Sequence, residues 1–110
     1  MNTSGYVILT LKFNKEGRRW TAYCEELGTA TFGRSLKEAQ EKIMEAVVLD
    51  LETLEDVGER ERFFKEHNIK LHRTKPSRDT LVPVAADKDV FFQPLIQPLP
   101  QKTDRVKVPA

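Results

Sequence analysis

Large apolar residues alternate with polar ones along the first part of the chain. The alternation runs through residues 6–13, pauses at residues 14–17 and resumes over residues 18–25. A period of two is typical of a strand with one buried face, and the intervening Asn-Lys-Glu-Gly supplies a tight turn. The pattern therefore predicts an antiparallel hairpin. Its buried face comprises Val7, Leu9, Leu11, Phe13, Trp20, Ala22 and Cys24.

The apolar spacing lengthens to about 3.6 residues after position 35, which is typical of a helix with one buried stripe. Before it, residues 26–28 predict a tight connection and residues 29–32 a short third strand. Ser35 and Glu38 fit a capping box, in which each side chain accepts from the other residue's amide, and Gly58 is placed to end the helix. The predicted sheet-facing stripe comprises Leu36, Ala39, Ile43, Ala46, Val47, Leu54 and Val57.

A shorter helix is predicted at residues 59–67, followed by a fourth short strand at residues 69–72. Together these elements predict an α+β domain over residues 1–72. It consists of a β-hairpin plus a third strand, in a three- to four-stranded, antiparallel-containing sheet packed on one long helix.

The composition changes beyond this domain, because all six prolines lie after residue 75. Residues 80–85 and 90–93 each have the character of an edge strand, but Pro83 and Pro94 lack the amide hydrogen that a central strand donates. We therefore expect residues 73–110 to be a proline-rich C-terminal extension. It would supply edge strands or an arm that joins copies of the chain.

The extension also contains large apolar residues, which an ordinary disordered terminus lacks. We expect them to pack on the domain or on a second copy of it, and Phe91 and Phe92 are candidate partner-binding residues. The apolar residues are Phe91, Phe92, Leu95, Ile96 and Leu99.

The long helix has a second apolar flank beside its predicted stripe, formed by Met44, Val48 and Leu51, while Leu49 projects on another side. A helix that is apolar nearly all round is covered on more than one side, which one small sheet does not achieve. We therefore predict a homodimer or a larger homo-oligomer whose contact includes this flank. Asp50 projects near the middle of the stripe, so it either lies past the sheet edge in water or meets a donor at the subunit boundary.

Charge and composition narrow the function classes. The 110 residues form one small domain with 18 basic and 17 acidic side chains and a formal net charge of +1, which argues against bulk electrostatic binding of a polyanion. No export leader is recognisable, and the longest apolar run, residues 46–49, is far shorter than the roughly 20 residues of a membrane span. A single cysteine, Cys24, fits a reducing compartment. We expect a cytoplasmic protein without membrane contact.

The candidate catalytic residues are few, and we expect a non-enzyme without cofactor, metal or small-molecule ligand. A two-metal nuclease of the ribonuclease H type needs a carboxylate on its opening strand, and residues 6–13 contain none. Cys24 shares a strand face with Trp20, which favours a buried thiol over a nucleophile. His67 and His72 are five residues apart, a spacing that is not typical of metal ligands.

One locally basic segment follows the domain, between positions 70 and 78. A solvated linker is the favoured interpretation, and contact with a nucleic acid or an acidic partner surface is the alternative. The residues are Lys70, Arg73, Lys75 and Arg78.

The order of elements over residues 6–72, together with several short motifs, resembles the HicB-like family. This family is the antitoxin component of a bacterial toxin–antitoxin pair. The matching positions are residues 20–24, Glu26, Leu27, Gly28, residues 31–33, Ser35, Glu38, Ala39, Ile43, Glu45 and Ala46. The resemblance implies a truncated ribonuclease H-like fold.

The resemblance also implies a function: a non-catalytic antitoxin of a type II system that binds and occludes a small, basic, mRNA-cleaving toxin of the HicA type. Glu25 and Glu26, at the second turn, are placed to complement a basic surface. Family members often append a ribbon-helix-helix or helix-turn-helix module, and the extension has neither pattern, so we do not expect direct DNA binding. The alternative is an orphan HicB-like protein that self-associates as a structural or regulatory subunit without a toxin.

Overall fold

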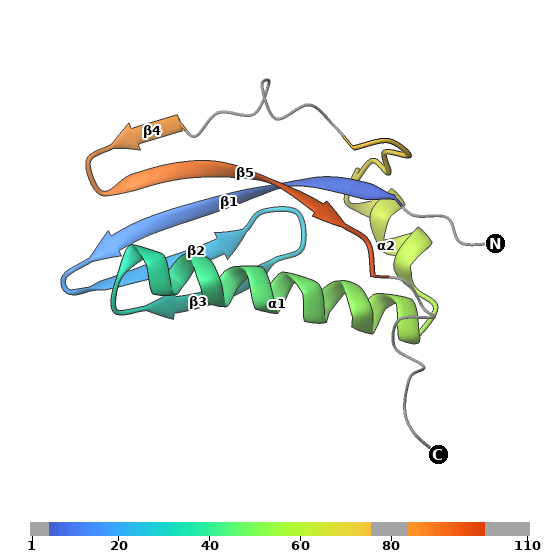
Figure 1. The fold of residues 1–110 in the computed structure, drawn as a ribbon, viewed down its shortest axis with the longest axis horizontal. Coiled ribbons are helices and arrows are strands. Elements are labelled where there is room, and N and C mark those ends of the chain that lie inside the picture. Colours follow the sequence, from blue (N-terminus) through green and yellow to red (C-terminus); the bar gives the residue numbers. More distant parts are fainter. Residues whose placement is uncertain (1–4, 76–83, 101–110) are drawn as a thin grey trace, which may run out of the picture.

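The structure, a computed structural model, describes residues 5–75 and 84–100. Its strands form one open antiparallel sheet in the order β3-β2-β1-β5-β4 (Figure 1). The α+β class is therefore confirmed, and the sheet is wider than predicted. The elements are β1 (Tyr6–Glu16), β2 (Arg19–Cys24), β3 (Thr29–Gly33), α1 (Leu36–Asp56), α2 (Arg60–Glu66), β4 (Val84–Asp87) and β5 (Val90–Pro98).

The predicted hairpin of β1 and β2 is confirmed, with Leu11 opposite Cys24 and Glu16 opposite Arg19. Gly17 takes the positive φ of 65° that the turn requires. Every second residue of β1 from Val7 to Phe13 is at most 1% exposed, while the residues between them are only half-buried. The alternation in the sequence therefore divides β1 between a core face and an outer face.

Ser35 caps α1 as predicted, because its hydroxyl accepts a 3.1 Å hydrogen bond from the Glu38 amide. The return bond differs from the prediction: the Glu38 carboxylate accepts from the amide of Arg34, at 2.6 Å, rather than from that of Ser35. The carboxylate reaches one residue further back along the chain. Gly58, at a φ of 73°, follows the end of the helix. Within the described ranges, neither helix is both long and apolar enough to cross a membrane.

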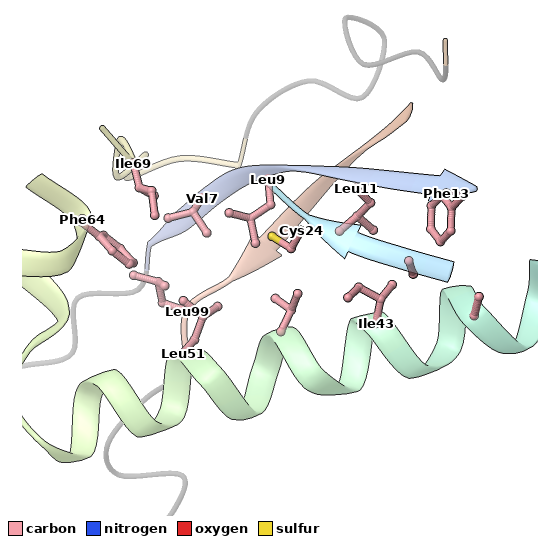
Figure 2. Packing of buried hydrophobic residues seen from close by; sticks show 13 residues of the cluster. Val7, Leu9, Leu11, Phe13, Cys24, Ile43, Leu51, Phe64, Ile69 and Leu99 are labelled. Atoms are coloured by element: carbon pink, nitrogen blue, oxygen red, sulfur yellow. The ribbon is translucent and has the colours of Figure 1, made fainter. Parts of the chain in front are cut away.

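The core lies between the sheet and α1, and its largest side chains come from β1 (Figure 2). Leu51 is fully buried, so its predicted place on a second flank is wrong. The helix turns an i, i+4 row toward the sheet, and this row has a different inclination from the stripe projected at 100° per residue. Val57 lies at the C-cap and is 60% exposed. The buried row comprises Ala39, Ile43, Val47 and Leu51.

One end of the core is closed by Phe64 of α2, by Ile69 and by Leu99, which gather near Val7 and Leu51 in Figure 2. The strand predicted at residues 69–72 is wrong. Only His72 bridges to Tyr6, because two bends at residues 73 and 74 turn the chain away from β1.

The C-terminal extension supplies β5, which pairs with β1 over its whole length, from Val90 opposite Asn14 to Pro98 opposite Tyr6. The prediction that prolines confine this segment to an edge is wrong, since β4 pairs with the other side of β5 at Val90, Phe91 and Phe92. Of the segment predicted at residues 80–85, residues 80–83 lie outside the described residues, as do residues 101–110.

The register explains why β5 tolerates prolines. Thr10, opposite Pro94, directs its amide and carbonyl toward the β2 side, where they bond to Glu26 and Glu25. Antiparallel pairs alternate between bonded and non-bonded, so the pair of Thr10 and Pro94 makes no hydrogen bond between β1 and β5. Pro98 has the same parity, and the next residue, Leu99, donates to the Gly5 carbonyl at 2.8 Å. The missing proline amides therefore lie on the side of β5 facing away from β1.

This register predicts different effects for neighbouring substitutions in β5. The Leu95 amide points toward β1, so Leu95→Pro should lower the free energy of unfolding by at least about 3 kcal/mol more than Leu95→Ala does. Pro94→Ala should change it by less than about 1 kcal/mol. Urea denaturation followed by circular dichroism measures all three. Equal destabilisation by Leu95→Pro and Leu95→Ala would contradict the register.

Candidate interaction surface

The second half of α1 is acidic. From Met44 to the end of the helix there are five acidic residues and no basic one, and no basic residue lies in the last turn. Carboxylates near a helix C-terminus are unfavourable because the exposed carbonyls there carry partial negative charge. A salt bridge from Arg60 to Glu55, at 3.1 Å, offsets part of this repulsion. The acidic residues, which we call the acidic half of α1, are Glu45, Asp50, Glu52, Glu55 and Asp56.

The turn between β2 and β3 contains two further acidic residues, Glu25 and Glu26, whose side chains lie in different environments. The Glu26 carboxylate accepts from the amide of Thr10, at 2.7 Å, and from its hydroxyl, at 2.9 Å. Glu26 therefore supplies a hydrogen-bond acceptor to the β1 backbone just beyond the end of β2. Glu25 is exposed, so of the predicted pair it is the side chain that is presented to solvent.

Asp50 connects this turn to the helix. Its carboxylate accepts a hydrogen bond from the hydroxyl of Thr29, the first residue of β3. This contact within one chain was not among the two alternatives predicted for Asp50, water or a subunit boundary, and the choice between those two stays a prediction. Asp50 is half-buried, and its contact places the β2–β3 turn beside the acidic half of α1.

A hollow of about 240 Å³ opens at the same place. Asp50 and Thr53 contribute to its walls, and the other lining residues are apolar. Long cationic side chains bury an aliphatic stem and keep the charged head near an anion. The hollow therefore has the chemistry to hold a lysine or arginine side chain from another molecule. Its lining residues are Leu27, Asp50, Thr53, Leu54 and Phe63.

Exposed apolar residues lie on the outer side of α1. Met44 is 44% and Leu49 is 62% exposed, whereas Val48 is half-buried. Of the predicted interface of Met44, Val48, Asp50 and Leu51, Met44 is therefore the most exposed member. The helical projection already set Leu49 apart from the core stripe, which agrees with its exposed position.

The two candidate aromatic residues of the extension point to opposite faces of the sheet. Phe91 stacks on Phe13, with ring centroids 5.2 Å apart, and meets the edge of Trp20 at 6.4 Å. Phe92 lies on the outer face, where the Lys12 ammonium is 5.8 Å from its ring centroid. Phe91 is thus a packing residue, and Phe92 belongs to a different surface.

The reactive candidates from the sequence occupy structural positions. Cys24 is fully buried, and desolvation raises the pKa of its thiol to about 11. His67 stacks on Phe63 at 3.9 Å, while His72 bonds to the backbone of Tyr6. Among the described residues, no three histidine, cysteine, aspartate or glutamate side chains are grouped to hold a metal ion.

Comparisons with known proteins do not assign a role to this surface, so its geometry alone guides the interpretation. No protein-family model matches the chain, and neither a curated protein nor a solved structure matches it.

The raised thiol pKa predicts a dependence of stability on pH. The unfolded thiol ionises near its ordinary value of 9.0 and the folded thiol near 11, so ionisation favours unfolding as the pH rises between these values. The stabilisation that depends on the protonated thiol is therefore complete below about pH 9 and is lost toward pH 11. The difference in unfolding free energy between the unmodified protein and Cys24→Ala should shrink by about 2 kcal/mol over this range. Urea titrations at each pH measure it, and a constant difference would show that the thiol is not desolvated.

Proposed function

We propose that this chain is a non-catalytic protein-binding module, a HicB-like antitoxin that binds a small basic toxin of the HicA type and covers its RNA-binding face. The proposal includes a truncated ribonuclease H-like fold over residues 6–72 and a place in the cytoplasm. The observation that carries it is the acidic character of the second half of α1 and of the β2–β3 turn with Glu25, which Asp50 joins through Thr29 beside the hollow.

The charge arrangement supports a basic partner. Acidic residues at the negative end of a helix lower stability, and they gain a favourable role when a basic surface covers them. Complementary charge also speeds association, which suits an inhibitor that must reach its target quickly. Leu49 supplies exposed apolar contact beside Asp50, and Met44 supplies a second exposed apolar side chain on another side of the helix.

The hollow offers a specific anchor for that partner. A lysine or arginine of the toxin would lay its stem along Leu27 and Leu54 and bring its charge to Asp50. The Thr29 hydroxyl already holds the Asp50 carboxylate in place, so little side-chain entropy is lost on binding. Covering the RNA-binding face of the toxin requires contact alone, so the chain performs no catalytic step.

The alternative function is an orphan module that self-associates. It is favoured by the same exposed apolar residues, Met44 and Leu49, which a second copy would cover. The acidic half of α1 argues against a symmetric helix-to-helix contact, because two copies would bring like charges together. A homo-oligomer joined through another surface remains compatible with toxin binding.

The test is co-expression with a small basic HicA-type toxin, encoded beside this chain where the genome provides one. The unmodified chain should restore growth and co-purify with the toxin. The double variant Glu25→Lys, Glu45→Lys should weaken binding at least about tenfold, which is about 1.4 kcal/mol, in titration calorimetry with catalytically inactive toxin. The matched control is Glu16→Lys, Glu41→Lys, which makes the same change of net charge at exposed positions outside the acidic surface.

Three outcomes would contradict the proposal. One is failure of the unmodified, folded chain to bind or neutralise the toxin. A second is equal weakening of toxin binding by both double variants, because binding would then depend on net charge and not on the acidic positions. A third is a stable homo-oligomer in light scattering that excludes the toxin, and this result would favour the orphan module.

A further inference from the structure

The outer face of the sheet is the second surface with an unusual composition. Both helices pack on the core face, and within the described residues no helix covers the other side (Figure 1). A solvated sheet face is normally polar at most positions, but this one is largely apolar and aromatic. The positions of β1, β2, β3 and β5 that share it are Tyr6, Ile8, Thr10, Lys12, Asn14, Glu16, Arg19, Thr21, Tyr23, Ala30, Phe32, Val90, Phe92, Pro94, Ile96 and Pro98.

Three aromatic residues gather toward the hairpin end of this face. Lys12 lies in register with Tyr23 on one side and with Phe92 on the other, so a row crosses three strands. Phe32 follows on β3, opposite Thr21. Tyr23 is 41% exposed and Phe32 is 53% exposed, which leaves much of each ring open to solvent. We call Lys12, Arg19, Tyr23, Phe32 and Phe92 the aromatic-basic row.

Cations accompany these rings. The Arg19 guanidinium is 4.9 Å from the Phe32 ring centroid, and the ammonium of Lys42, from α1, is 5.8 Å from the same centroid. Lys12 stands in the same relation to Phe92. Across residues 5–75 and 84–100, no salt bridge joins Lys12 or Arg19 to a carboxylate. Glu16 is in register with Arg19 on this face, but no ion pair joins the two within the described residues, so both cations can meet an anion from outside.

We propose that the aromatic-basic row binds single-stranded nucleic acid. Exposed aromatic rings on an antiparallel sheet accept stacked bases, and neighbouring cations meet the phosphates between them. Tyr23 and Phe32 provide the stacking surfaces, and Lys12 and Arg19 provide the phosphate contacts. A second copy of the chain fits this surface poorly, because face-to-face packing would set the same cations against one another.

The mode of binding agrees with the balanced charge of the chain. A net charge of +1 does not support bulk attraction of a duplex, but stacking contributes about 1–3 kcal/mol per base and needs few phosphate contacts. The row lies on the outer face of the sheet, whereas the acidic half of α1 belongs to the helix on the other face. The proposal therefore stands independently of toxin binding.

The experiment measures fluorescence anisotropy of labelled 12-nucleotide oligo-uridine and oligo-deoxythymidine with the full chain at about 50 mM salt. Both should bind with micromolar dissociation constants, and the ratio of the two shows whether the ribose hydroxyl contributes. Tyr23→Ala and Phe32→Ala should each weaken binding about tenfold, and Tyr23→Phe should retain it. Lys12→Gln should lower the dependence of affinity on salt by about one phosphate contact.

Two control variants, Met44→Ala and Leu49→Ala, remove comparably exposed apolar side chains from α1 and should leave oligonucleotide binding unchanged. Circular dichroism confirms that each variant is folded. The inference is overturned if no anisotropy change occurs up to about 1 mM protein, or if a duplex of equal length binds as tightly. It is also overturned if polyglutamate competes as well as oligo-uridine, because that result assigns the row to an acidic protein partner. Tyr23→Ala should leave toxin binding intact, so failure here and failure of the antitoxin proposal are distinguishable.

Discussion

The pairing of β5 with β1 is the interaction on which the rest of the structure depends. It places β1 inside the sheet, with β2 along one side and β5 along the other, so both edges of the most apolar strand are used. It also brings Leu99 into the core beside the end of α1. Without β5 the sheet would end at β1, and the strand that supplies four of the largest buried side chains would be an exposed edge.

Because β1 is central, the alternation of its side chains determines which residues of the sheet face the core and which face outward. Odd-numbered positions from Val7 to Phe13 build the core with α1, and the residues between them, together with those in register on β2, β3 and β5, form the outer face. Charge is unevenly distributed along the helix as well: Lys37 and Lys42 balance Glu38 and Glu41 in its first half, while the second half is acidic. One face of the fold therefore presents an acidic helix with a hollow, and the other presents aromatic rings with cations. The two proposed binding surfaces therefore lie on opposite faces of the sheet.

The sequence alone predicted the features that depend on local periodicity and missed those that depend on register. The hairpin, the Ser35 cap and most of the buried helix row follow from spacing and short-range hydrogen bonds. The place of β5 could not be predicted from Pro94 alone, because the effect of a proline depends on which way its missing amide would point. The inclination of α1 to the sheet decided the burial of Leu51, and a projection on one helix contains no such information. That Phe91 and Phe92 point to opposite faces of the sheet could be predicted, because neighbouring residues of a strand alternate between its faces.

Amide hydrogen exchange, followed residue by residue by NMR spectroscopy, tests the central position of β1 most directly. The amides of Val7 and Leu9 point toward β5, whereas the amide of Ile8 points to the other side, beyond the end of β2. We expect slow exchange at Val7, Leu9 and Leu95, near the rate of global unfolding, and much faster exchange at Ile8. Rapid exchange at both Leu9 and Leu95 in the folded protein would contradict this expectation, because β5 would then not be paired with β1.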